Sequence, residues 1–560
     1  MCKLCDDGIP QKHSAEVIPQ NRSDEGIPQS HSDSRRDFLK ATAATGVAAA
    51  GLNLFSARPA VAHDDDDGPK DTGRPGRRYI IRGGAVMSMD PSVGDFPKAD
   101  VLVEGKKILA VGPNLHAGGA DEIDARGRIV MPGFVDTHHH QAWTAIRSSI
   151  PDSVLIDDGS GRPSAAQNYF GNILLGFAPK YRPQDVYISE LFGGLAQLDN
   201  GVTTVHDVSQ IHHSPEHSDA AIQALFDTGR RAAFGFFESA GANILGTNPD
   251  NQYPQDATRI KKQWFSSSDQ LVHMIMGGEV YLGDASTVAS WTLGRQLGLQ
   301  VAAHILSPFG IRSTLDRLTN GTFPNGIQVG ADNLFIHMTG MSDPAWAKVK
   351  DVGAQVSIAF PIEMNMRHGI PPIHMMQALG IEPSLSTDVE TNLTADFFTQ
   401  MRSAMTLQRV VVNQDILNTG DFTTFVGGVS PGSAWPPPPA PPAPGSLPLL
   451  NVRDVLRYAT INGAKHLRLD SKTGTLKPGK EADIIILDGT HINVFPVNHV
   501  PGAVVQMMER SNVETVIVAG KVRKWKGKLL DVNLGRLRRE LEKSRDFIFN
   551  AAGVPQNLFR

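Results

Sequence analysis

Short apolar segments alternate with longer amphipathic segments through the middle of the chain, from Pro132 to about residue 470. Apolar runs of about four to eight residues are typical of buried strands, and the stretches between them are long enough for helices. This alternation predicts a parallel α/β sheet, and eight such units predict a closed (β/α)8 TIM barrel. The predicted strands are the segment that ends at His140 and residues Gly201–Val208, Arg231–Phe237, Leu271–Met276, Leu299–His304, Asn333–His337, Ala354–Phe360 and Pro383–Asp388.

Both flanks of this region are rich in short β segments. Residues 78–131 contain strand-like runs such as Asp100–Val103 and Ile108–Val111, and residues 471–530 contain a similar run at Ala482–Leu487. The two flanks together predict a small β-sandwich that is built from both chain ends and accompanies the barrel, residues 132–470.

Two further segments interrupt or follow these regions. Between Pro431 and Pro448, nine of 18 residues are proline, which excludes a helix or a central strand and predicts a surface polyproline loop. This loop acts either as a solvated spacer or as a lid. At the C-terminus, residues 531–560, the charged segment Arg536–Phe549 predicts a surface helix that is followed by a tail.

The first 62 residues follow the pattern of an export signal. Ser34–Lys40 contains paired arginines, Ala41–Phe55 is small and apolar, and Ala60–Ala62 fits a cleavage site. The order resembles a twin-arginine signal, which exports folded proteins. We therefore expect a signal peptide over residues 1–62, a linker over residues 63–77, and a periplasmic or secreted protein.

Composition narrows the function classes. The chain has 560 residues, 41% hydrophobic and 20% charged, which is typical of a globular protein and excludes a coiled coil or a collagen. A net charge of -5 provides no basic surplus for nucleic acid. Both cysteines, Cys2 and Cys5, lie in the predicted leader, so a disulfide framework is excluded as well. We expect a small-molecule substrate, no nucleic-acid partner, no stable membrane anchor, and a homo-oligomer.

Histidines at the ends of predicted strands are the candidate metal-binding and catalytic residues. His138 and His140 share one face of the first strand, so both can hold one metal ion while His139 points elsewhere. Other strands also end in residues that bind metals or transfer protons, and strand ends converge on one mouth of a TIM barrel. Three imidazoles and a carboxylate suit one divalent ion, zinc or iron. The further strand-end residues are His206, His304, His337 and Asp388.

Several motifs resemble those of the amidohydrolase superfamily. Pro132–His140 is similar to its first-strand motif, Gly201–Val205 to its second strand, and Thr460–Asp483 to the segment that returns from barrel to sandwich. Asn365–Pro372 is similar to a segment of the chloro-triazine and cyclic amidine hydrolases and related deaminases, although Met364 replaces their usual serine.

The resemblance implies specific roles. His138, His140, His304 and Asp388 would bind one metal ion, and His337 would orient the nucleophilic water or polarise the substrate. Asp388 would also take the water proton and pass it to the leaving group. Two-metal members often carry a lysine on the fourth strand, and the sequence has none between residues 271 and 282, so one metal is expected.

The chain departs from the family pattern after His304. Family deaminases usually have a glutamate three residues later, and here Ser307 occupies that position. A hydroxyl cannot replace this acid. Either another carboxylate substitutes, with Glu238, Glu279 and Glu390 as candidates, or the substrate needs no such acid.

The sequence therefore predicts a metal-dependent hydrolase that uses a metal-activated water to cleave a C–N bond, of amide, amidine or aromatic amine type, in a small cyclic or aromatic nitrogen compound. Candidate substrate contacts are Trp143, His206, Ser307 and Glu279. Three alternatives remain open: a decarboxylase or hydratase on the same scaffold, a deaminase with a displaced carboxylate, and a binding protein without activity.

Overall fold

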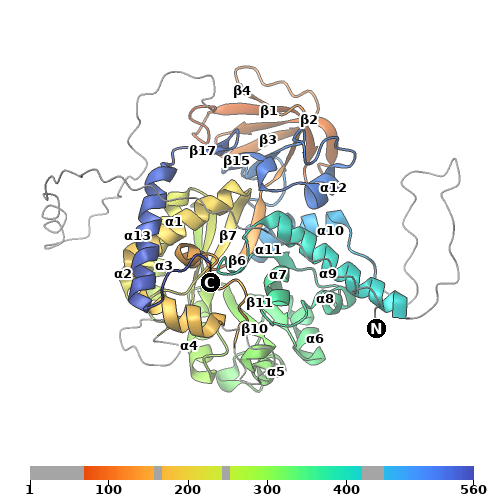
Figure 1. The fold of residues 1–560 in the computed structure, drawn as a ribbon. Coiled ribbons are helices and arrows are strands. Elements are labelled where there is room, and N and C mark those ends of the chain that lie inside the picture. The colour runs from red at the N-terminus through yellow and green to blue at the C-terminus, as the bar shows by residue number, and fades with distance from the viewer. Residues whose placement is uncertain (1–67, 157–166, 242–252, 419–446, 560) are drawn as a thin grey trace, which may run out of the picture. The chain divides into compact units, whose positions relative to one another are not determined.

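The computed structural model describes residues 68–156, 167–241, 253–418 and 447–559. Eight strands form a parallel sheet in the order β13-β12-β11-β10-β9-β8-β7-β6 (Figure 1). An isolated parallel bridge between His139 and Asp388 joins the two ends, so the sheet closes into the predicted TIM barrel. The strands are β6 (Phe134–His139), β7 (Val202–Ser209), β8 (Arg231–Phe236), β9 (Val272–Gly277), β10 (Val301–Leu306), β11 (Asn333–Thr339), β12 (Gln355–Ile358) and β13 (Ser384–Leu385).

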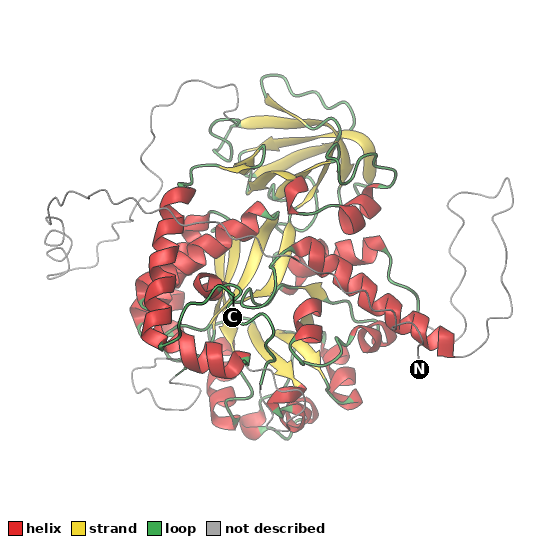
Figure 2. Cartoon of the chain, viewed as in Figure 1, coloured by secondary structure: helices red, strands yellow, loops and turns green. Residues whose placement is uncertain are grey.

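Helices follow the strands and surround the barrel (Figure 2). The first, α1 (Pro183–Asp199), packs against α2 (Pro215–Thr228) and against the C-terminal helix α13 (Leu534–Ala552), which contains the predicted Arg536–Phe549. The others are α3 (Ala257–Trp264), α4 (Asp284–Gln296), α5 (Arg312–Asn320), α6 (Asp343–Val352), α7 (Phe360–Asn365), α8 (Ile373–Leu379), α9 (Phe397–Asn418), α10 (Val452–Arg457), α11 (Gly463–His466) and α12 (Val500–Gly502).

The second sheet has nine strands and draws on both chain ends, as predicted. Its order is β17-β16-β15-β14-β5-β1-β2-β3, with β4 paired to β1. The antiparallel pair of β5 with β14 joins the N-terminal part to the C-terminal part. The strands are β1 (Arg78–Met87), β2 (Asp95–Glu104), β3 (Lys107–Gly112), β4 (Asp121–Asp124), β5 (Arg128–Pro132), β14 (Ile484–Asp488), β15 (Val513–Val518), β16 (Lys521–Trp525) and β17 (Lys528–Leu529).

This sheet curls around its own core instead of dividing into two separate sheets. The Tyr79 hydroxyl donates to the Gly520 carbonyl at 2.9 Å, which holds the β15–β16 turn against β1. Gly520 has a φ of +74°, and a Cβ there would lie 1.9 Å from the Gly105 carbonyl oxygen, so only glycine fits this close approach. The enclosed core includes Val101, Ile484 and Ile517.

A buried ion-pair group connects barrel and second sheet. Arg231, at the start of β8, donates to Asp483 at 2.8 Å and to Glu481 at 2.8 Å, and all three side chains are at most 5% exposed. Asp483 also accepts the backbone N–H of Ala519 at 2.7 Å. The barrel strand that begins at Arg231 is therefore fixed to the segment leading into β14.

Some predictions fall on residues that the structure does not describe. The predicted signal peptide, residues 1–62, lies outside the described residues, and so do the first part of the linker and nearly all of the proline-rich loop over residues 431–448. Within the described ranges, no helix is both long and apolar enough to cross a membrane.

Candidate metal centre and pocket

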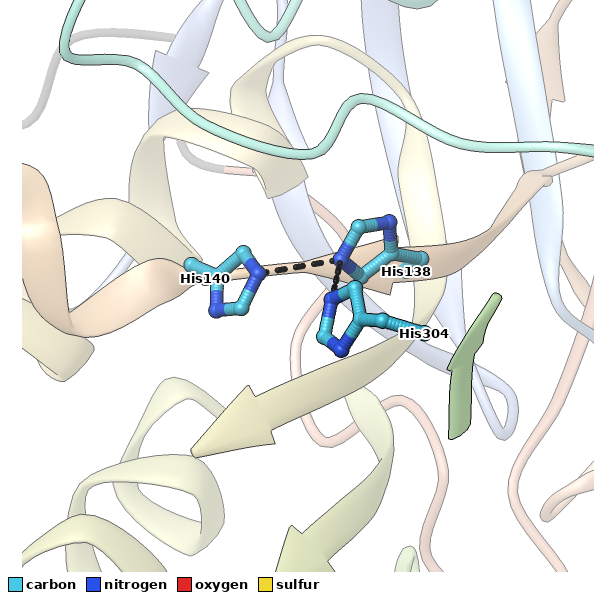
Figure 3. A group of neighbouring side chains, drawn as sticks. All are labelled: His138, His140 and His304. Atoms are coloured by element: carbon cyan, nitrogen blue, oxygen red, sulfur yellow. Dashed lines mark hydrogen bonds between the residues drawn. The ribbon is translucent and has the colours of Figure 1, made fainter. Parts of the chain in front are cut away.

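Three histidine side chains converge at the mouth of the barrel (Figure 3). The Nε2 atom of His138 lies 3.1 Å from Nε2 of His140 and 3.1 Å from Nε2 of His304. The Asp388 carboxylate lies close to them, with Oδ1 3.6 Å from Nε2 of His138 and 3.7 Å from Nε2 of His140. The structure thus brings the four predicted ligands together in one buried group.

Backbone pairing at the barrel seam sets this geometry. The N–H of Asp388 donates to the His138 carbonyl at 2.9 Å, and the N–H of His140 donates to the Asp388 carbonyl at 2.8 Å. His139 points to the opposite face, as its position in the strand predicts, and its Nδ1 lies 3.0 Å from the Thr387 hydroxyl. Because β6 and the end of β13 meet here, residues 250 positions apart in sequence present their side chains to the same point.

The hydrogen bonds of two imidazoles fix which nitrogen faces the centre. Nδ1 of His140 donates to the Val208 carbonyl at 3.1 Å, and Nδ1 of His304 is hydrogen-bonded to the Glu279 carboxylate. Each Nε2 is then left with its lone pair toward the other ligands. Burial lowers the pKa of both histidines, so both imidazoles are neutral and suited to metal coordination.

The arrangement of these nitrogen and oxygen atoms suits a divalent metal ion. Burial raises the pKa of Asp388 to about 7, and its Oδ2 has no hydrogen-bond partner among the described residues. Clustered imidazole lone pairs beside a carboxylate repel one another unless a cation lies between them. Tetrahedral zinc is bound by such N and O ligands.

His337 lies beside this group on β11. Its Nδ1 pairs with Oε1 of Glu363 at 2.9 Å, and its Nε2 lies 3.6 Å from Oδ2 of Asp388. His337 and Asp388 have φ values of +74° and +62°, in the left-handed region that non-glycine residues rarely adopt. Strained backbone of this kind clusters at functional sites, where the surrounding structure maintains it.

A pocket is lined in part by three of the four candidate ligands, His140, His304 and Asp388. It encloses about 390 Å³ of space not filled by protein atoms, part of which is open to solvent. Its wall combines aromatic and aliphatic side chains with polar ones. The lining residues are His140, Leu155, Tyr169, Leu174, Gln210, Tyr281, His304, Leu306, Phe309, His337, Met366, His368, Asp388 and Val389.

None of the four predicted substrate contacts lines this pocket. Trp143 is buried and donates to the Tyr169 hydroxyl at 2.8 Å, so it supports a lining residue from behind. Nδ1 of His206 donates to the Thr137 carbonyl at 2.9 Å. Ser307 is exposed, and Glu279 supports His304. Direct substrate contact by these residues stays a prediction.

Sequence reasoning did not single out several pocket residues. Tyr281, Gln210 and His368 come from loops that follow barrel strands, and such loops line the site of most TIM barrels. Their positions shortly after predicted strands were the one available sign that they could reach the site. The sequence does not show which loop side chains turn into the pocket.

Comparison with known proteins places the chain among hydrolases. The model of the family described as Amidohydrolase family matches residues 129–424 and 448–523. A 5'-deoxyadenosine deaminase of Methanosarcina barkeri is 26% identical over 487 residues, with 83% of this chain and 97% of the relative covered. A 5-methylthioadenosine/S-adenosylhomocysteine deaminase of Pelotomaculum thermopropionicum is 24% identical over 489 residues, with 83% of this chain and 97% of the relative covered.

Solved structures show the same fold at lower identity. An adenosine deaminase from Xanthomonas campestris with bound zinc has a TM-score of 0.65 and 19% identity, covering 85% of this chain and 99% of its own. Atrazine chlorohydrolase from Arthrobacter aurescens TC1, complexed with zinc, has a TM-score of 0.65 and 19% identity, covering 83% of this chain and 100% of its own.

Proposed function

Because the chain belongs to the amidohydrolase family and is a metal-dependent hydrolase of C–N bonds other than peptide bonds, we propose that it removes the amino group from a small aromatic nitrogen heterocycle. The observation that supports the proposal is the convergence of His138, His140, His304 and Asp388 beside a pocket whose wall is partly aromatic. One zinc ion is the metal we propose, since three imidazoles and a carboxylate match its preferred ligands.

The side chains around the ion divide the proton transfers between them. When bound, a divalent metal lowers the pKa of a water molecule so that hydroxide is accessible near neutral pH. Nδ1 of His337 donates to Glu363, so its Nε2 accepts a hydrogen bond and orients the attacking water. Asp388, with Oδ2 free of other partners among the described residues, takes a water proton and delivers it to the leaving amine.

The pocket wall favours a planar ring as substrate. Tyr169, Tyr281 and Phe309 line it, and aromatic faces stack well on flat heterocycles. The relatives named above are deaminases of adenosine-type compounds, and the atrazine chlorohydrolase acts on a triazine. We propose that in the substrate of this chain the reacting carbon lies next to a ring nitrogen.

Metal analysis combined with an ammonia-release assay tests this function. The zinc-loaded protein is expected to contain about one equivalent of metal and to release ammonia from at least one member of a panel of aminopurines, aminopyrimidines and aminotriazines. His138→Ala and Asp388→Ala should lose metal and activity, whereas His491→Ala, which changes an exposed histidine, should lose neither.

Two results would contradict the proposal. A correctly folded protein that binds no divalent metal would exclude the metal-dependent route. A metal-loaded protein that releases no ammonia but releases carbon dioxide or hydrates a double bond would instead support a decarboxylase or hydratase.

We also propose export by the twin-arginine route, which rests on the leader sequence alone. Arg35 and Arg36 precede the apolar segment Ala41–Phe55. N-terminal sequencing of the protein from the cell exterior should begin near His63, and replacing both arginines with lysine should retain the uncleaved chain inside the cell. Unchanged export of that variant would refute the route.

A further inference from the structure

The proposed deamination needs an acid that protonates the ring nitrogen next to the reacting carbon, and Ser307 cannot supply it. The sequence offers three candidate carboxylates near the predicted strand ends, Glu238, Glu279 and Glu390. Glu279 is committed to His304, because its two oxygens accept the Nδ1–H and, at 3.1 Å, the backbone N–H of that ligand. Glu390 is committed to Arg147, whose guanidinium donates to it at 2.8 Å. Glu363, which was not among the three, is engaged as well, because it pairs with Nδ1 of His337 at 2.9 Å. Of the three, Glu238 alone makes no hydrogen bond to a candidate metal ligand or to an arginine among the described residues.

Glu238 follows β8 and lies beside the pocket. Its side chain is 1% exposed, and its Oε2 has no hydrogen-bond partner among the described residues. Burial and the neighbouring Glu279 carboxylate raise the pKa of Glu238 to about 8, so the group holds its proton at neutral pH. The titratable groups around it are Glu279, His304, Tyr281, Tyr253 and Tyr169.

Two pocket residues connect Glu238 to the site. The Tyr281 hydroxyl and the Gln210 amide, the latter at 2.8 Å, both bond to Oε1 of Glu238. Both Tyr281 and Gln210 line the pocket that contains the metal ligands. Burial raises the pKa of Tyr281, so its hydroxyl can pass a proton along without remaining ionised. The carboxyl thus contacts the pocket through the Tyr281 hydroxyl, which donates to Glu238 in the structure and would turn its proton toward a bound ring when the protonated carboxyl donates to it in return.

We propose that Glu238 and Tyr281 form the catalytic acid of this enzyme, with Tyr281 donating to the ring nitrogen of the bound heterocycle and Glu238 restoring the tyrosine proton. This assignment rests on the proposed deaminase function. Glu238 follows β8, the third barrel strand. It takes the role of proton donor from the glutamate that family deaminases carry after the fifth strand, here β10.

The proposed reaction balances in atoms and protons, and water is the only co-reactant. The ring nitrogen gains the Tyr281 proton as water oxygen bonds to the neighbouring carbon, and the first water proton moves to Asp388. Asp388 transfers it to the amino group, and the C–N bond breaks with its electron pair on the departing ammonia. The remaining hydroxyl proton returns to the Tyr281–Glu238 pair as the ring carbonyl forms.

Gln210 adds a recognition element to the same wall. Its Nε2 donates to Glu238, and its Oε1 is buried without a partner among the described residues. The Oε1 acceptor of Gln210, together with the proposed donor Tyr281, matches a substrate amino group beside an unprotonated ring nitrogen. This pair of groups forms the edge of a cyclic amidine. A ring that lacks either group leaves a buried polar atom unpaired and is disfavoured.

Substitutions in the pair test the assignment. Glu238→Gln and Tyr281→Phe are each expected to lower kcat for ammonia release about 10²–10⁴-fold, the usual contribution of general acid catalysis. Zinc content, thermal midpoint and inhibition by the deaminated product should stay near wild type, because neither residue binds the metal. Tyr187→Phe and Asp227→Asn are matched controls, since Tyr187 donates to Asp227 at 2.8 Å on the outer helices α1 and α2.

The outcomes separate this assignment from the proposed function. A wild-type enzyme that deaminates, together with a Glu238→Gln or Tyr281→Phe variant whose kcat is within threefold of it, would overturn the acid while leaving the deaminase intact. If Glu238→Gln does not fold, Tyr281→Phe alone decides. A wild-type protein with metal but without deaminase activity would overturn both.

Discussion

Glu279→Gln tests whether the hydrogen bonds between Glu279 and His304 support metal binding. Glu279 is fully buried after β9 and touches only the back of His304 among the metal ligands. One oxygen fixes the Nδ1–H of the imidazole, and the other accepts the backbone N–H at 3.1 Å. The carboxylate therefore sets both the tautomer and the orientation of His304.

The size of the effect follows from those two contacts. Glutamine keeps one acceptor oxygen but presents an amide N–H₂ to the second donor, so one of the two contacts to His304 is lost. Losing a partner behind a ligating histidine typically weakens metal binding by about 10–100-fold. This corresponds to about 1.4–2.7 kcal/mol of zinc-binding free energy.

Competition against a chromophoric chelator measures the zinc dissociation constant directly. Glu279→Gln should raise it 10–100-fold, and saturating zinc should restore most of the activity. Glu216→Gln, which changes a poorly buried glutamate on α2, should leave the constant unchanged. An unchanged constant for Glu279→Gln, or lost activity that excess zinc does not restore, would refute a supporting role for Glu279.

Three further results are expected. Ammonia release should decline as the pH rises through about 8, because only the protonated form of Glu238 donates, and Glu238→Gln should lose that decline; a pH profile of kcat checks this. Ser307→Ala should keep most of the activity, because Ser307 is exposed outside the pocket, and steady-state kinetics would show otherwise through a loss of several orders of magnitude. Arg231→Met should lower the free energy of unfolding in urea by about 3–5 kcal/mol, because two buried carboxylates lose their partner, whereas Arg126→Met at an exposed pair should change it by less than about 1 kcal/mol.

The barrel could be predicted because buried parallel strands are nearly continuous apolar runs, which differ from the amphipathic helices between them. All eight runs are strands in the structure. The boundaries were less predictable at the seam: the segment Pro383–Asp388 forms only the two-residue strand β13, and Asp388 then pairs with β6 through a single bridge at a φ of +62°. The apolar pattern does not show where a regular strand gives way to such a bridge.

The convergence of the candidate metal ligands could be predicted for a related reason. In a closed barrel every strand ends at the same mouth, so a histidine at a strand end is already placed near the centre. Glu238, Tyr281 and Gln210 lie beyond the strand ends, where loop conformation decides whether a side chain points inward or outward. Sequence could name Glu238 as one of three carboxylates, but only the contacts of Glu279 and Glu390 show that those two are engaged elsewhere.

The absence of a glutamate after His304 does not therefore remove the acid from the site. Gln210, Glu238, Tyr281 and His304 come from or follow four consecutive strands, β7 to β10, and neighbouring strands of a barrel deliver their ends to neighbouring points of the mouth. A carboxylate that follows β8 can consequently reach the region served by one that follows β10, provided that a neighbouring group such as Tyr281 extends its reach into the pocket. The position of an acid in the sequence motif is then a weaker guide to deaminase chemistry than the presence of a buried, protonated carboxyl at the pocket wall, and the kcat of Glu238→Gln distinguishes the two criteria.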